Sequence, residues 1–101
     1  MKSKTSELTG VHLDRAVAHA LGTPDDGNGL PYYSTDWALG GPLIERENIA
    51  LWSEGYDWEA KIQTGAGEWL AEWDEYPLIA AMRCYVASKL GDEVEIPEEL
   101  K

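Results

Sequence analysis

The sequence predicts an α+β domain in which a three- or four-stranded antiparallel sheet packs against an N-terminal and a C-terminal helix. Apolar and polar residues alternate over 58–63 and 69–73, which predicts neighbouring strands, because successive side chains of a strand point to opposite faces. Apolar residues at helical spacing over 77–90 predict a helix that covers the sheet. A chain of 101 residues is near the commonest domain size, so we expect a single domain over 1–101 with one core.

The first helix is predicted from its ends and from its apolar stripe. Thr9 can cap its start, and Gly22 can end it in the left-handed conformation that glycine favours. Leu8 and Leu13 have the spacing of a hydrophobic staple, which fixes how the chain enters a helix. The predicted buried stripe consists of Leu13, Val17, Ala20 and Leu21.

Short elements are predicted between the first helix and the sheet. Residues 23–29 have the composition of a loop. Residues 30–34 are predicted to form a short strand, which Pro31 restricts to a sheet edge. A turn or short helix, capped by Ser34 or Thr35, then begins at Asp36 and is interrupted by the glycines that precede Pro42. Pro42 suits the first turn of a second helix, which continues through Leu43, Ile44 and Glu47.

The middle of the chain is predicted to form an antiparallel meander. Its strands cover residues 49–53, 58–63 and 69–73, and turn-forming residues at 54–57 and 64–67 join them. On the central strand, the side chains of one face are apolar and predict a dry surface: Trp58, Ala60 and Ile62. On the last strand, Trp69, Ala71 and Trp73 alternate with Glu68, Leu70 and Glu72.

The last helix is predicted over residues 77–90, with Pro77 in its first position and Gly91 after its end. One broad face is apolar: Leu78, Ile79, Met82, Tyr85, Val86 and Leu90. The opposite face is made of small residues: Ala80, Ala81, Cys84, Ala87 and Ser88. Small residues allow close approach, so we predict that this face is covered either by the first helix or by a second copy, in a homo-oligomer that uses Ala80, Cys84 and Ala87. A short acidic tail is expected over residues 92–101.

Charge and cysteine content exclude several classes of protein. The formal net charge is −11, with 8 Lys and Arg against 19 Asp and Glu, so direct binding to nucleic acid or to an anionic membrane is not expected. Residues 1–10 are polar and no apolar run approaches the roughly 20 residues that span a bilayer, so a cytoplasmic protein is expected. Cys84 is the single cysteine, which rules out an internal disulfide.

The residue types that carry catalysis are sparse. One cysteine and two histidines, His12 and His19, cannot assemble a usual zinc site. Cys84 lies on a predicted helix with no histidine near it in sequence, so it is not expected to act as a nucleophile. Carboxylate pairs are too common in an acidic chain to indicate acid–base catalysis. We therefore expect a protein that is not an enzyme, with no catalytic residue, no metal and no cofactor.

One segment has the composition of a ligand-binding site. The run Tyr32, Tyr33, Ser34, Thr35, Asp36 and Trp37 places rings, hydroxyls and a carboxylate between predicted elements. Together with Arg46 and Arg83, it could stack a planar, anionic small molecule and bind its charge. The alternative is structural: the rings would pack the sheet, and Ser34, Thr35 and Asp36 would cap the turn.

Long runs of the sequence resemble the phage NinX-like family. The resemblance rests on residues 34–47 and 77–94, and the opening segment 4–10 fits as well. The element Tyr33 to Asp36, followed by strands and a last helix, is also similar to phage αβα-sandwich domains. The resemblance implies a small protein of a tailed phage or prophage with no assigned function, acting in the cytoplasm of the infected cell. No catalytic residues come with the family.

We expect a non-enzymatic accessory protein of the phage that binds something of the host. One hypothesis is counter-defence, in which the protein sequesters a small nucleotide-type signal at the aromatic segment. The alternative is an acidic inhibitor that occupies a basic surface of a host nucleic-acid-processing protein. A hydrolase with an unrecognised site is a third hypothesis.

Overall fold

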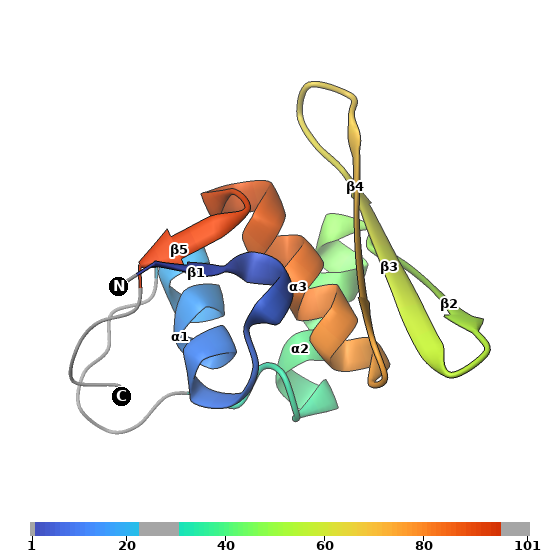
Figure 1. Ribbon diagram of the computed structural model, residues 1–101, viewed down its shortest axis with the longest axis horizontal. Helices are drawn as coiled ribbons and strands as arrows, with labels where there is room; N and C mark the ends of the chain where they lie inside the picture. The colour runs from blue at the N-terminus through green and yellow to red at the C-terminus, as the bar shows by residue number, and fades with distance from the viewer. Residues whose placement is uncertain (1, 23–30, 96–101) are drawn as a thin grey trace.

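The computed structural model describes residues 2–22 and 31–95, which form three α-helices, one 3-10 turn and two antiparallel sheets (Figure 1). The larger sheet has the strand order β2-β3-β4, with β2 at Ala50–Glu54, β3 at Asp57–Gln63 and β4 at Trp69–Asp74. The helix α3 (Pro77–Leu90) packs on this sheet and lies at the centre of the molecule. These elements confirm the predicted α+β fold.

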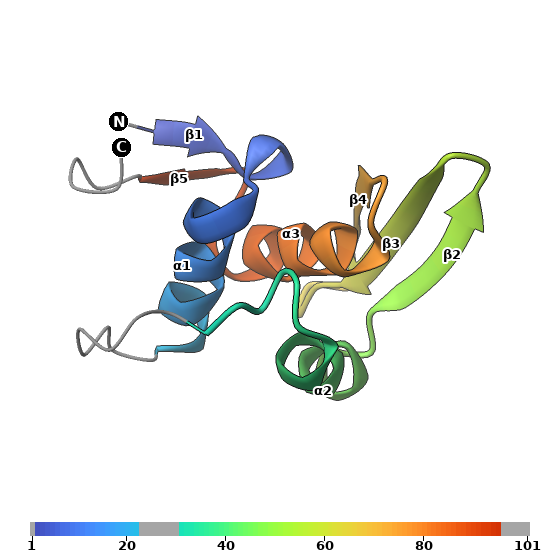
Figure 2. The ribbon, with the colours of Figure 1, turned by 90° about the horizontal axis from the view of Figure 1, so that it is seen from below.

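The two other helices pack against α3. The helix α1 (Gly10–Leu21) contacts α3 on one side, and α2 (Trp37–Glu47) contacts it near the sheet (Figure 2). The predicted ends of α1 are confirmed, because Thr9 precedes it in extended conformation and Gly22 follows it with φ +75°, but the Thr9 side chain forms no capping hydrogen bond. Leu8 and Leu13 are both buried in the core, as the predicted staple requires.

The sequence gives little sign of the smaller sheet, which joins the two ends of the described chain. The strand β1 (Lys2–Lys4) pairs with β5 (Glu93–Glu95), and the two lie side by side in Figure 2. The 3-10 turn η1 (Thr5–Glu7) follows β1. Buried Thr5 fixes the junction, since its amide donates to the Asp92 carbonyl at 2.8 Å and its hydroxyl to the Gly91 carbonyl at 2.7 Å.

The prediction of a strand over residues 30–34 is wrong for the described residues 31–34. Residue 30 and the predicted loop 23–29 lie outside the described residues, and Pro31 to Ser34 form an irregular segment and a turn. The Tyr32 carbonyl accepts from the amides of Thr35 at 3.2 Å and Asp36 at 2.8 Å, which closes the turn. The Ser34 amide donates to the buried Asp14 carboxylate of α1 at 2.8 Å, so it is directed toward a helix and away from a sheet.

The helix α2 begins earlier than predicted. It starts at Trp37, and the Asp36 carboxylate caps it by accepting from the Ala38 amide at 2.9 Å, so Pro42 lies inside the helix. Gly40 lies within α2 and does not interrupt it. Its role is to allow close packing. A β-carbon at this position would lie 2.6 Å from both the Leu78 side chain of α3 and the Tyr33 carbonyl. Only glycine lets α2 approach α3 this closely.

The helix α3 has the predicted ends, with Pro77 first and Gly91 following at φ +92°. Both of its faces are buried, and Ala80 and Cys84 are 0% exposed. The Cys84 sulfur lies 3.5 Å from the carbonyls of Ala60 and Leu70, so the small-residue face packs on the sheet. The prediction that α1 or a second copy covers the small-residue face is therefore wrong, because the sheet already covers Cys84. The oligomeric state itself stays a prediction.

Candidate functional site

The predicted ligand-binding segment is divided between the interior and the surface. Tyr32 is 67% exposed, whereas Tyr33 packs against the core and Ser34 is buried. Among the described residues, the buried Ser34 hydroxyl has no hydrogen-bond partner. Thr35 is exposed and its amide closes the turn, and Asp36 caps α2. The structural alternative therefore accounts for much of this segment.

Trp37 and Arg46 are the predicted site residues that the fold brings to one hollow. The hollow is open to solvent and is lined by Trp37, Ala38, Gly41, Pro42, Glu45 and Arg46. All of these residues belong to α2, so the hollow is a notch on one helix rather than a cleft between elements. Trp37 is 52% exposed and offers one ring face to a planar ligand.

The cation of this hollow is already paired. Arg46 forms an ion pair with Glu47 at 2.9 Å, and its guanidinium lies 3.5 Å from the Tyr85 hydroxyl. The hydrogen bond that Arg46 donates to the Glu47 carboxylate raises the pKa of Arg46, against a smaller opposing effect of burial. Glu47 also pairs with Lys89 at 3.6 Å. A phosphate at Arg46 would have to compete with this carboxylate.

Arg83 does not belong to the hollow. It is 7% exposed and projects from α3 to hold two other parts of the chain. Its guanidinium donates to the Leu8 carbonyl at 2.8 Å and to the Trp73 carbonyl at 2.9 Å, and it pairs with Asp74 at 3.1 Å. These bonds fasten the start of α1 and the end of β4 to α3, so Arg83 is a structural residue.

The sheet carries an aromatic surface that sequence reasoning did not single out. Ala60 is 0% and Ile62 3% exposed on the side that α3 covers, which confirms the predicted dry face for these two residues, whereas Trp58 on the same side is half-buried. On β4, the Leu70 carbonyl lies beside Cys84 of α3, whereas Trp69 and Trp73 are 59% and 50% exposed. We call the uncovered side the open face; it includes Ala50, Trp52, Glu59, Lys61, Gln63, Trp69, Ala71 and Trp73.

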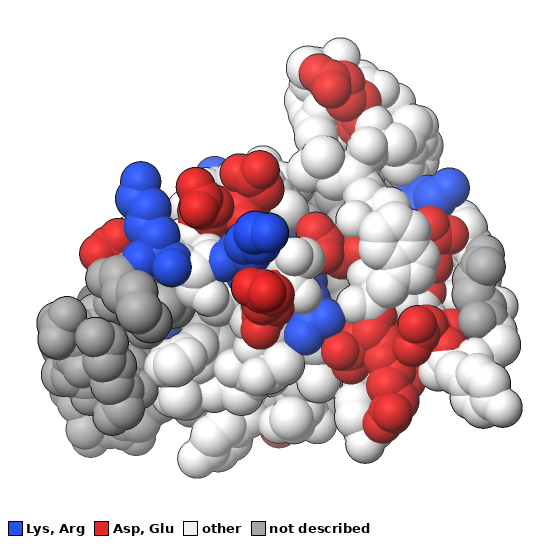
Figure 3. Space-filling view, viewed as in Figure 1, with Lys and Arg blue, Asp and Glu red and all other residues white. Residues whose placement is uncertain are grey.

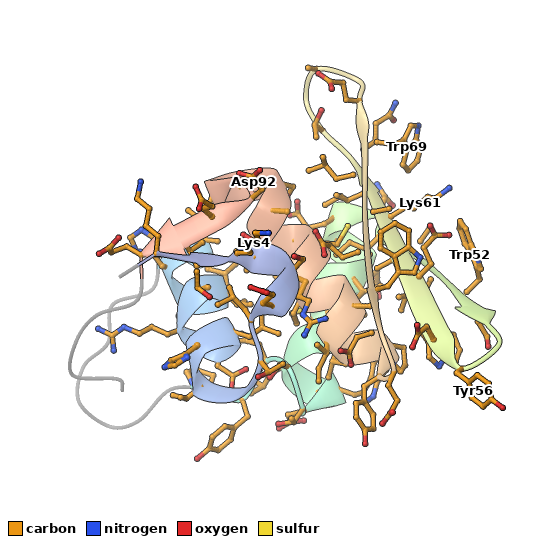
Figure 4. The ribbon with its side chains drawn as sticks, viewed as in Figure 1. Lys4, Trp52, Tyr56, Lys61, Trp69 and Asp92 are labelled. Carbon is orange, nitrogen blue, oxygen red and sulfur yellow. The ribbon has the colours of Figure 1, made fainter. Side chains whose placement is uncertain are left out.

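The open face has a polar pair at its centre. Lys61 places its ammonium 4.8 Å from the centre of the Trp52 ring, a cation–π contact. Glu59 is only 8% exposed although none of the described helices or strands covers this side, because Trp52 and Trp73 flank it on the neighbouring strands. Figure 4 shows Trp52, Lys61 and Trp69 on the side of the sheet away from α3, with Tyr56 at the β2–β3 turn. The alternation in β4 was the signal for this face.

Burial raises the pKa of two titratable groups under the sheet, Cys84 and Glu72. Burial raises the pKa of the Cys84 thiol to about 12, with a smaller contribution from Glu72. Burial also raises the pKa of Glu72, and Arg83 opposes this effect. A thiol that stays protonated at neutral pH is a poor nucleophile. Within the described part of the chain, no three His, Cys, Asp or Glu side chains gather where they could hold a metal ion.

Carboxylates are unevenly distributed over the surface. Figure 3 shows acidic side chains gathered at the foot of β4, where this strand leads into α3. In the smaller sheet, by contrast, Glu93 stands opposite Lys4 and Glu95 opposite Lys2, so opposite charges face each other across the strands. The predicted tail thus begins as part of a sheet, and residues 96–101 lie outside the described residues. None of the described helices is long and apolar enough to cross a membrane.

Sequence comparison assigns the chain to a family. The family model described as Bacteriophage P22, NinX matches residues 4–89, so the chain belongs to this family, as its resemblance indicated. No curated protein matches the chain. The matched residues run from β1 to the end of α3 and include the α2 hollow and the open face.

Proposed function

We propose that this member of the phage NinX family is a non-enzymatic accessory protein whose acidic surface binds a basic surface of a host nucleic-acid-processing protein. The supporting observation is that carboxylates hold the arginines that could have received a phosphate ligand. Arg46 pairs with Glu47, and Arg83 pairs with Asp74. A net charge of −11 then attracts a basic partner and repels an anionic one.

The foot of the sheet is the part of the surface best suited to this contact. Asp57 begins β3, and the residue after it, Trp58, pairs with Asp74 at the end of β4. Glu75 follows Asp74 directly. Both Asp57 and Glu75 are exposed. Closely spaced carboxylates on exposed strand ends resemble the charge pattern of a nucleic-acid backbone. A basic groove that binds phosphates would bind these carboxylates by the same long-range attraction.

The test is capture from nuclease-treated host lysate followed by titration of the purified captured protein. We expect a basic nucleic-acid-processing protein to bind at about 50 mM salt and to be released at several hundred millimolar salt, since salt screens exposed charges. Duplex DNA should displace the phage protein from this partner, because both would occupy one basic surface. Capture that is insensitive to salt, or a partner that binds DNA and this protein together, would contradict the proposal.

A matched pair of double variants locates the contact. Asp57→Asn with Glu75→Gln removes two carboxylates from the foot of the sheet and should weaken the complex about ten-fold, a typical size for two charges in an electrostatically steered complex. Glu93→Gln with Glu95→Gln removes the same charge where Lys4 and Lys2 stand opposite. This control pair should leave the affinity nearly unchanged. Equal losses in both variants would indicate net charge alone and would exclude a defined site at the foot.

Sequestration of a nucleotide-type signal is the second candidate function. It is favoured by the position of Trp37 and Arg46 in one hollow, and opposed by the Glu47 ion pair. Calorimetry with cyclic and linear nucleotide signals tests it directly. Trp37→Ala should weaken binding roughly ten-fold, since stacking of a base on an aromatic ring contributes about 1–3 kcal/mol. Tyr56→Ala is the control, because Tyr56 is 97% exposed and lies outside the hollow. Absence of binding by the wild-type protein would exclude this candidate.

A further inference from the structure

Two neighbouring rows of side chains at the centre of the open face differ in size and in charge. The strand register aligns Trp52, Glu59 and Trp73 in one row across β2, β3 and β4. It aligns Ala50, Lys61 and Ala71 in the next row. One row is therefore bulky with an acid at its centre, and the other is small with a base at its centre.

We propose that the open face binds a second copy of the same chain to form a two-fold symmetric dimer. A two-fold axis can run across the strands, parallel to the sheet and between the two rows. Rotation about this axis places each row of one copy opposite the other row of its partner. Each large ring of these two rows then faces a small residue, Trp52 over Ala50 and Trp73 over Ala71. Glu59 of each copy faces Lys61 of the other.

The same surface patch thus complements itself in shape and in charge, as an isologous interface requires. Stacked sheets lie about 10 Å apart with interdigitating side chains, and the alanine row leaves the space that the indoles need. Trp52 and Trp73 are 37% and 50% exposed in the single chain, so the dimer would remove large apolar surface from water.

The polar centre of the face is explained by the same arrangement. Glu59 is 8% exposed and lies at the base of the space between two indoles, where a carboxylate is costly unless a cation neutralises it. A lysine can reach into such a space, because its long stem packs on rings while its ammonium meets the carboxylate. Lys61 is already held over an aromatic ring in its own chain. Its partner's Glu59 would lie within the same aromatic environment.

Salt dependence separates this dimer from the proposed host contact. Each copy carries a net charge of −11, so two copies repel each other at long range. Salt screens this repulsion, whereas the Glu59–Lys61 pairs are covered and are screened less. The dimer should therefore strengthen between about 50 and 500 mM salt, while a complex with a basic host protein should weaken. The test uses the purified full chain alone, so its outcome does not depend on any host partner.

The experiment is sedimentation equilibrium of the 11.2 kDa chain over roughly 1–100 µM, the range in which a micromolar dimer changes its mass. Wild-type protein should approach twice the chain mass as its concentration rises. Ala71→Trp fills the space that receives Trp73 and should weaken the dimer at least ten-fold. Ala66→Trp is the matched control in the exposed β3–β4 turn and should leave the dimer unchanged. A wild-type mass of one chain throughout, or equal behaviour of the two variants, would overturn the proposal.

Charge reversal gives the most specific test of the geometry. Glu59→Lys alone places Lys opposite Lys, and Lys61→Glu alone places Glu opposite Glu, so each variant should be monomeric. An equimolar mixture restores a Glu–Lys pair at every contact and should form a heterodimer. Circular dichroism establishes that each variant is folded before mixing. If the folded variants remain monomeric when they are mixed, this register is excluded. If either variant forms a dimer on its own, the open face is excluded as the interface.

Discussion

The two faces of the β2–β3–β4 sheet differ in a way that hydrophobicity alone would not predict. The side that α3 covers carries the buried Ala60 and Ile62, with Trp58 half-buried nearer the start of β3, whereas the uncovered side carries the more exposed Trp52 and Trp73. The cause is the close approach of α3, which presents Ala80 and Cys84 to the sheet. A tryptophan in place of Ala60 would not fit into this contact, because Ala60 is fully buried against α3. Burial is therefore decided by fit against the central helix, and large rings remain where space is available.

The arginines predicted to bind a ligand follow the same division. Arg83 lies under the end of the sheet and donates to backbone carbonyls of η1–α1 and β4. Arg46 lies on the outer surface of α2, with 58% of its side chain exposed. Its buried position on α3 makes Arg83 part of the fold, whereas Arg46 forms its ion pair with Glu47 at the surface.

Removal of Arg83 should produce the largest loss of stability. Arg83→Met leaves the Leu8 and Trp73 carbonyls and the Asp74 carboxylate without their partner, and breaking a buried ion pair typically costs about 3–5 kcal/mol. Urea unfolding, followed by tryptophan fluorescence, measures the change in the free energy of unfolding. Arg46→Met is the control and should leave this free energy within experimental error. Similar losses for the two variants would contradict the division between the buried Arg83 and the exposed Arg46.

The adjacent glycines of α2 provide a second, smaller comparison. Gly40→Ala places a methyl group 2.6 Å from Leu78 and from the Tyr33 carbonyl, so it should destabilise the protein by about 1–3 kcal/mol. Gly41→Ala meets nothing nearer than the Trp37 ring at 4.0 Å and should stabilise the helix by up to about 1 kcal/mol. Thermal unfolding of both variants measures the difference. A stabilised Gly40→Ala variant would show that α2 does not pack this closely on α3.

Local signals in the sequence predicted the elements that end in a residue with a special backbone preference. Gly22 and Gly91 end α1 and α3, and Pro77 begins α3, as expected. The start of α2 could not be placed, because Pro42 is common in a first turn and its actual surroundings depend on α3. The β1–β5 pair could not be found either, since it joins short segments from opposite ends of the chain.

The candidate site was predictable only in part. Trp37 and Arg46 share a helix, and the structure brings them to one hollow. Arg83 could not be assigned from sequence, because its partners include the backbone carbonyls of Leu8 and Trp73. Every residue has such a carbonyl, so the sequence does not indicate which ones accept a hydrogen bond. The alternation of β4 identified which side chains share a face, but the covered face was fixed by the approach of α3.

The third and smallest effect concerns the thiol on the covered face. Cys84 is 0% exposed and donates toward the carbonyls of Ala60 and Leu70, so burial disfavours the thiolate and raises the pKa to about 12 from an ordinary value of 9.0. As the pH rises above 9, the unfolded chain ionises Cys84 while the folded chain does not. The stability that this thiol contributes is therefore intact below pH 9 and is lost as the pH rises toward 12.

Between pH 7 and pH 10 this linkage should reduce the free energy of unfolding by about 1.4 kcal/mol. This is the effect of the single pH unit, from about 9 to 10, over which the thiol is ionised in the unfolded chain and protonated in the folded chain. Cys84→Ala is the control, because it lowers stability by a pH-independent amount and removes only the thiol's share of the slope. Burial also raises the pKa of Tyr85, but this group titrates alike in both proteins and cancels in their difference. Urea unfolding at pH 7, 9 and 10 measures both slopes. Parallel slopes would mean that Cys84 ionises as readily in the folded chain as in the unfolded one, and that the sheet does not seal the face beneath α3.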